Sequence, residues 1–226
     1  MRLSRVIPAL VLILGATRLA VGASIVELRE AAERGMSDAA NQLGMAYYLG
    51  HGTARDLREA ARWIRAAAEK NDPAAQANLA ALYDRGDGVP RDPEQAMQWY
   101  LKAAKRGNDL AQVLLGSKYE YAEGTTENPG EAFRWYERAA KADNVDGQYR
   151  VGLCYLNGKG VKQDFAKAYF WLFLACSGSE QPPANYEKAK AVAGGLLEEK
   201  EVQAIDKRGE QWLAQKRKPA RSLGMR

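Results

Sequence analysis

Residues 75–107 read AQANLAALYDRGDGVPRDPEQAMQWYLKAAKRG, and the pattern of this stretch recurs along the chain. Trp99 belongs to a series of four tryptophans that lie 36 residues apart. Four further series of identical residues keep the same step, and they begin at Tyr47, Gly52, Ala60 and Ala67. Self-similarity at a fixed period of this length is the sequence signature of a repeat protein. The chain therefore contains four full repeats, at about 36–71, 72–107, 108–143 and 144–179.

The first half of each repeat has the pattern of an amphipathic helix. In the first repeat, apolar and small residues follow the i, i+3, i+4, i+7 spacing, at Ala40, Leu43, Gly44 and Tyr47. A glycine pair follows this stripe in the first, second and fourth repeats. Glycine there permits the left-handed backbone of a helix C-terminus, so the first helix ends in a tight turn.

The second half of each repeat predicts a second helix. An Asp or Asn can cap its start by accepting a hydrogen bond from a free backbone N–H, at Asp56, Asp92, Asn128 and Asp164. The buried stripe of this helix in the first repeat comprises Ala60, Trp63, Ala67 and Ala68. Small residues such as Gly44 and Ala60 would let the two helices approach closely.

These residues resemble the Sel-one-like repeat, a relative of the tetratricopeptide repeat. The second repeat shows the pattern most fully, with Ala75, Leu79, Tyr83, Gly86, Gly88, Val89, Asp92, Ala96, Trp99, Tyr100, Ala103, Ala104 and Gly107. The departures are Ala122, the third-repeat loop Thr125–Pro129, and Asn71, Asp143 and Ser179 at the terminal glycine position. The resemblance implies an all-α, right-handed α/α superhelix, or solenoid. It also implies a protein-binding scaffold of the kind found in exported bacterial proteins that take part in signalling, envelope assembly or host contact.

Both ends of the repeat array carry sequences that could cap a solenoid. Before the first repeat, a half-repeat with Leu28, Ala31, Ala32 and Gly35 matches the second helix of a unit. The second helix of the fourth repeat, residues 168–175, is apolar on every side and needs a cover. After the break at Pro182 and Pro183, cap helices at about 184–213 can supply that cover.

Residues 1–23 are typical of a cleavable secretory signal peptide. Two early arginines precede an apolar run of 11 residues, and small residues end at Ala23. The run is too short for a stable transmembrane span, which needs about 20 residues. The alternatives are a buried first helix or an uncleaved signal anchor. Cleavage would leave an exported protein, periplasmic or secreted, that begins at Ser24.

The formal net charge of +5 comes from the two ends of the chain. Residues 1–23 and the tail 214–226 contain eight basic residues and no acid, whereas residues 24–213 have a net charge of −3. A nucleic-acid-binding protein would need a basic face on the folded part, so the charge does not predict one. The basic tail is expected to be disordered, with at most a weak contact to an anionic surface.

The sequence contains no recognisable catalytic or cofactor-binding constellation. His51 is the single histidine, which excludes a histidine-based triad and a multi-histidine zinc site. Cys154 and Cys176 would lie about 15 Å apart along a helical hairpin, too far for a disulfide. We therefore expect a non-enzymatic protein without cofactor or metal. The alternative is a cell-wall or antibiotic-related hydrolase like some cysteine-rich exported relatives.

A partner-binding face is predicted on the first helix of each repeat. In the first repeat, positions 41, 45 and 48 point away from Leu43, and this face lines the groove in tetratricopeptide-like solenoids. The candidate contacts for a protein or peptide are Asn41, Met45, Tyr48, Asp84, Val113, Glu120, Tyr149, Leu153 and Leu156. The alternative is that the C-terminal cap covers the apolar members of this set.

Overall fold

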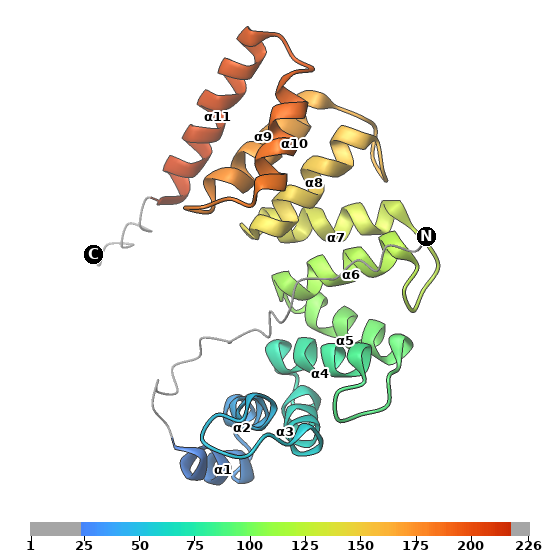
Figure 1. Cartoon of the computed structure of the whole chain (residues 1–226), viewed down its shortest axis with the longest axis vertical. Coiled ribbons are helices and arrows are strands. Elements are labelled where there is room, and N and C mark those ends of the chain that lie inside the picture. Colours follow the sequence, from blue (N-terminus) through green and yellow to red (C-terminus); the bar gives the residue numbers. More distant parts are fainter. Residues whose placement is uncertain (1–23, 218–226) are drawn as a thin grey trace, which may run out of the picture. The chain divides into compact units, whose positions relative to one another are not determined.

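A computed structural model describes residues 24–217 (Figure 1). The described part is entirely helical and contains the short first helix α1, the paired helices of four repeats and two further helices. In chain order the elements are α1 (Ile25–Glu33), α2 (Ser37–Leu49), α3 (Leu57–Glu69), α4 (Pro73–Arg85), α5 (Pro93–Lys105), α6 (Asp109–Tyr121), α7 (Pro129–Lys141), α8 (Val145–Asn157), α9 (Phe165–Ser177), α10 (Ala184–Gly194) and α11 (Glu199–Arg217). The two helices of the first, second and fourth repeats pack on one another, and α3 packs on α4 and α7 on α8, so the expected α-solenoid of helix-turn-helix repeats is confirmed.

The chain forms two compact units that divide between Ala111 and Gln112. In the first unit, α1 packs on α2, and the helices of the first two repeats form hairpins. In the second unit, α8 packs on both α7 and α9. The predicted signal peptide, residues 1–23, lies outside the described residues, as do residues 218–226 of the tail.

The predicted caps of the second helices form in every repeat. The side chain of Asp56 accepts hydrogen bonds from the N–H groups of Arg58 and Glu59. The caps of α5, α7 and α9 bind the third residue of their helices in the same way, through Asp92, Asn128 and Asp164. Each cap satisfies a backbone donor that has no partner within the helix.

The turn after the first helix has the expected left-handed residue, including in the repeat that lacks glycine. Gly50, Gly86 and Gly158 end α2, α4 and α8 with φ values of 74°, 80° and 69°. In the third repeat Ala122 occupies this place at φ 55°. An L-residue with a side chain is strained in this region, so the third-repeat turn is held by its surroundings.

Close contact between the two helices of a repeat depends on the small residue of the first helix. A Cβ atom built on Gly116 would lie 2.5 Å from Cε1 of Tyr136. Gly44 and Gly152 face Ile64 and Leu172 at similarly short range. The predicted role of these positions as contact points is therefore confirmed, because a larger residue would separate the helices.

The core of the first unit is formed by fully buried leucine and isoleucine side chains, including Leu43, Ile64, Leu79 and Leu82. Buried amides join the helices beside this core. The side chain of Gln76 donates to the backbone oxygen of Ala68, at the end of the preceding helix. Gln112 and Gln148 occupy the same position in the next repeats and are also buried. We did not anticipate this glutamine series from the sequence, although its 36-residue spacing is visible there.

The apolar helix α9 packs against both α10 and α11, as the sequence predicted (Figure 1). Gly209 of α11 faces the ring of Phe173, and Gly194 of α10 faces Tyr169. The hydroxyl of Tyr169 also donates to Asp206, which fixes α11 on α9. Leu196, which lies within the predicted cap at about 184–213, is 51% exposed and is therefore not part of the cover.

The last helix extends four residues beyond the expected end of the cap and reaches Arg217. Lys216, which we expected in the disordered tail, donates to both carboxylate oxygens of Asp143 at 2.8 and 2.6 Å. Asp143 has a left-handed backbone, with φ 66°. This ion pair connects the end of α11 to the junction between the third and fourth repeats.

Candidate functional site

The predicted binding positions of the first repeat are buried in the core, so they do not form the open groove face that the helical spacing predicted. Asn41, Met45 and Tyr48 are each only 6–7% exposed. The Asn41 side chain accepts a hydrogen bond from Asn78, and Tyr48 donates to Asp87. The helical wheel of α2 alone could not show this, because residues from the next repeat supply the cover.

Two more of the predicted positions are partly or fully covered. Val113 is 6% exposed and packs in the core of the second unit with Tyr136 and Ala139. Asp84, at the end of α4, is half-buried.

The apolar members of the predicted face contact the cap. The ring of Tyr149 stacks on that of Tyr186 in α10, with centroids 3.9 Å apart, and its hydroxyl accepts from Asn185. Leu153 and Leu156 pack against the cluster formed by α9, α10 and α11. This arrangement matches the alternative in which the C-terminal cap covers these residues. Substitution of Tyr149 would therefore disturb the cap as well as any binding face.

Glu120 remains as a polar side chain at the surface of the second unit, and it organises a network. Its Oε2 atom accepts a 2.8 Å hydrogen bond from the buried hydroxyl of Tyr136, which also lies 3.1 Å from Ser117 Oγ. Arg150 lies 3.6 Å and Lys159 4.0 Å from its carboxylate oxygens. The network thus joins α6, α7 and α8.

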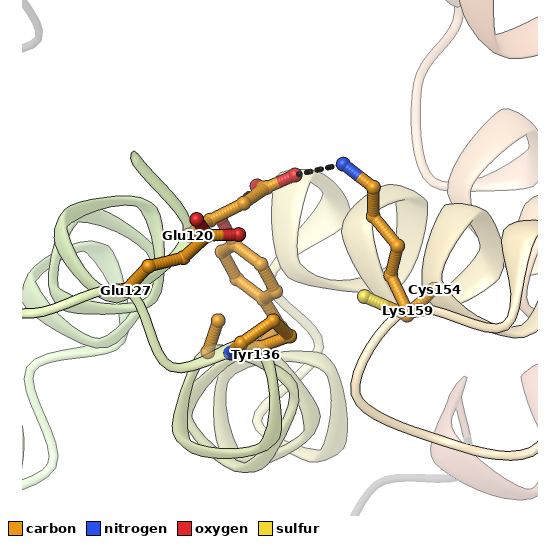
Figure 2. A pocket seen from close by; sticks show the side chains of 7 residues that line it. Glu120, Glu127, Tyr136, Cys154 and Lys159 are labelled. Carbon is orange, nitrogen blue, oxygen red and sulfur yellow. Dashed lines mark hydrogen bonds and ion pairs between the residues drawn. The ribbon is translucent and has the colours of Figure 1, made fainter. Parts of the chain in front are cut away.

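A shallow pocket lies beside this network, with a cavity volume of about 20 Å³ (Figure 2). Its lining residues are Glu120, Glu127, Pro129, Ala132, Tyr136, Cys154 and Lys159. Small-molecule sites usually occupy roughly 300–1,000 Å³. The pocket is therefore much smaller than a usual small-molecule site, and it can receive at most the end of one side chain.

The pKa values of two groups in the pocket, the Cys154 thiol and the Tyr136 hydroxyl, are raised. Burial raises the pKa of the Cys154 thiol to about 12, and the nearby Glu120 charge adds to this effect. The thiol is therefore protonated and a poor nucleophile. Burial also raises the pKa of Tyr136 far above its usual range, so its hydroxyl keeps its proton.

The sequence interpretation missed Tyr136, Arg150, Glu127 and Lys159 as members of this site. At the position of Tyr136 the other repeats carry Ile64, Tyr100 and Leu172, and at that of Arg150 they carry Gln42, Asn78 and Leu114. For Arg150 the available signal was therefore a departure from the other repeats, whereas Tyr136 follows the same pattern as Tyr100.

Other kinds of site find no support in the described residues. Cys154 and Cys176 are both buried free thiols. Between residues 24 and 217, no group of three or more His, Cys, Asp or Glu side chains is placed to hold a metal ion. No helix in this range combines the length and hydropathy that crossing a membrane requires.

The paired helices and their constant 36-residue spacing define an α-helical repeat protein. The Sel1 repeat model matches residues 37–72, 73–108, 109–144 and 145–180. The chain therefore belongs to the Sel1 repeat family. Repeats of this family are generally protein-interaction modules and typically non-catalytic. No protein with a curated description matches the chain.

Two solved structures resemble the chain in sequence as well as fold. One is c5321, described as a protective antigen present in uropathogenic Escherichia coli strains, with 27% identity and a TM-score of 0.73. The match covers 84% of this chain but only 43% of c5321, so the chain spans less than half of that relative. The other is a Sel1 repeat protein from Oxalobacter formigenes, with 28% identity, a TM-score of 0.70, and coverage of 83% and 78%.

Proposed function

We propose that the chain is an exported, non-enzymatic scaffold that binds another protein and serves bacterial envelope signalling, assembly or host contact. The binding surface is formed by Glu120 and Tyr121 of α6, Arg150 of α8 and Lys159 in the turn after α8. This surface revises the predicted set, of which it retains Glu120 and excludes the residues that lie in the core.

The observation that carries the proposal is that aromatic and charged side chains remain accessible on one face of the second unit. Tyr121 is 40% exposed, and the side chain of Lys159 is 63% exposed. Arg150 lies between them, 3.4 Å from the Tyr121 hydroxyl. Tyr and Arg are enriched at protein interfaces because they combine apolar area with directed hydrogen bonds.

Export is supported by the order of features in residues 1–23, a basic start followed by an apolar run and small residues. The c5321 antigen and the Oxalobacter protein show that related repeats occur in bacteria. The non-enzymatic role is supported by the protonated Cys154 thiol and by the size of the pocket.

Photo-crosslinking in bacterial cells tests the proposal. A photoreactive residue at position 159 should give an adduct of defined mass, and Tyr121→Ala should reduce its yield. The matched control is the same residue at position 134, where Arg134 is exposed on α7. Identical adducts from both positions, or none from position 159, would contradict the proposed surface.

A further inference from the structure

A hydrogen bond from the loop to the first helix recurs in three of the four repeats. The guanidinium Nε of Arg55 donates to the backbone oxygen of Tyr48 at 3.0 Å. Arg91 makes the equivalent bond to Asp84 at 3.0 Å, and the amide of Gln163 makes it to Leu156 at 2.8 Å. In each case a side-chain N–H binds a carbonyl near the end of the helix, where the last carbonyls have no intrahelical partner.

The third repeat cannot form this bond. Its residue at the same place is Glu127, and the corresponding carbonyl is that of Glu120. An ionised glutamate accepts hydrogen bonds but has no N–H to donate. In the third repeat, therefore, an anionic glutamate stands at the position where the other three repeats have an arginine or glutamine that donates a hydrogen bond.

The pocket lies at this place. Figure 2 shows the carboxylates of Glu120 and Glu127 on one side of it and the ammonium of Lys159 on the other. Pro129, Ala132, Tyr136 and Cys154 complete the lining with largely apolar atoms. Two carboxylates beside an apolar lining suit a side chain that has a cationic end and an aliphatic stem.

We propose that the third repeat binds an arginine side chain of the partner protein in place of the arginine that its own loop lacks. This inference rests on the proposed function and names the chemistry of the partner at the same surface. The guanidinium donates to the Glu120 carbonyl, as Arg55 and Arg91 do in their own repeats, and pairs with the carboxylates of Glu120 and Glu127.

Arginine fits better than lysine for two reasons. The planar guanidinium has five N–H donors in a fixed fork, so one group can bind a carbonyl and a carboxylate together. The sister repeats also provide the template, because Arg55 and Arg91 bind their carbonyls through the same group. The intramolecular cations Arg150 and Lys159 are weak competitors, since they lie 3.6 and 4.0 Å from the carboxylate oxygens of Glu120. Both distances exceed the roughly 2.7–2.9 Å of a charge-assisted hydrogen bond.

The test uses the full chain and two acetylated, amidated tripeptides, Gly-Arg-Gly and its citrulline analogue. Binding is followed by NMR titration of the backbone amides around residues 120–127. The arginine peptide should give saturable shifts there, and the neutral citrulline peptide should bind roughly fivefold more weakly, the upper range for an accessible ion pair. Equal binding of the two peptides, or shifts spread over the whole chain, would overturn the inference.

Variants of the pocket make the test specific. Glu127→Ala should weaken the binding of the arginine peptide about fivefold, because it removes the carboxylate without adding a donor. Glu127→Arg should abolish binding because it restores the loop's own arginine. Lys159→Ala should tighten binding by removing the competing cation. The control, Glu94→Gln, changes an exposed glutamate on α5 and should leave binding unchanged.

Glu127→Arg also has a readout that does not depend on any peptide. It should raise the thermal midpoint of the chain, because the loop gains the bond seen at Arg55 and Arg91. A variant that unfolds at a lower temperature than the parent would overturn the inference. If the adduct at position 159 forms equally in the parent and in Glu127→Arg, the arginine site is wrong while the proposed scaffold function stands.

Discussion

The hydroxyl of Tyr136 on α7 donates a 2.8 Å hydrogen bond to Glu120 Oε2 on α6. Tyr136 is only 1% exposed, so this bond connects a buried ring with a carboxylate at the rim of the pocket. The ring itself fits because Gly116 leaves room for it. Packing within the third repeat thus positions the charged group of the candidate site.

Tyr136→Phe should lower the free energy of unfolding by about 1.5–3 kcal/mol, the usual range for losing a hydrogen bond to a charged group. Urea denaturation measures the change. Tyr155→Phe is the matched control, because it keeps the edge-on packing of the ring against Phe133 and should change stability by less than about 0.5 kcal/mol. Equal effects of the two substitutions would show that the Tyr136 hydroxyl has no special role.

Ala122→Gly should stabilise the chain by about 0.5–1 kcal/mol, because glycine adopts a φ of 55° without the strain that a Cβ atom causes. Thermal unfolding monitored by circular dichroism measures the shift. Ala142→Gly is the control, since Ala142 ends α7 at φ −85° and should be slightly destabilised by glycine. A loss of stability in Ala122→Gly would contradict the strain assigned to this turn.

Ionisation of the Cys154 thiol should lower the free energy of unfolding at alkaline pH. Its pKa is about 12 in the folded chain, above the ordinary value of 9.0, because burial disfavours the thiolate. The contribution of the protonated Cys154 thiol to the free energy of unfolding is therefore complete below pH 9. It is lost as the pH rises from 9 towards 12, because the thiol of the unfolded chain releases its proton first.

The measurement for Cys154 compares the parent with Cys154→Ala in urea between pH 7 and pH 10.5. Their difference in unfolding free energy should stay constant up to about pH 8.5 and then shrink in favour of the variant. Tyrosine ionisation affects both proteins alike and cancels in the comparison. A difference that does not change across this range would refute the burial assigned to the thiol.

The chain recovered from the bacterial periplasm or medium should begin at Ser24. In the described structure Ser24 is the N-cap of α1 and forms a capping box with Glu27. N-terminal sequencing or intact mass measures the cleavage point. A chain that retains Met1 and fractionates with membranes would instead support the uncleaved anchor.

The sequence predicted the parts of the fold that depend on recurring residues. Asp56, Asp92, Asn128 and Asp164 could be recognised as caps because a cap requires only its own helix. The burial of Asn41 and Tyr48 could not be predicted in this way, since their cover comes from Asn78 and Asp87 in the next repeat. Helical periodicity describes one helix and contains no information about such neighbours.

The candidate site was only partly accessible from the sequence. Glu120 was selected as a partner contact on the groove face of its helix, and the pocket beside it was not predicted. The meaning of Glu127 depends on a bond between Arg55 and the Tyr48 carbonyl, which involves a backbone atom that no residue pattern specifies. Once that bond is known, Glu127 becomes informative, because the other repeats have a hydrogen-bond donor at its position.

The apolar helix α9 has a consequence for biosynthesis. The ribosome makes α9 before α10 and α11, so the nascent chain exposes the most hydrophobic of the described helices until α10 and α11 emerge. A messenger truncated between these helices would yield four complete repeats that aggregate. Translation must therefore reach α11 before the apolar surface of α9 is covered and the product no longer self-associates, even though every repeat is already present.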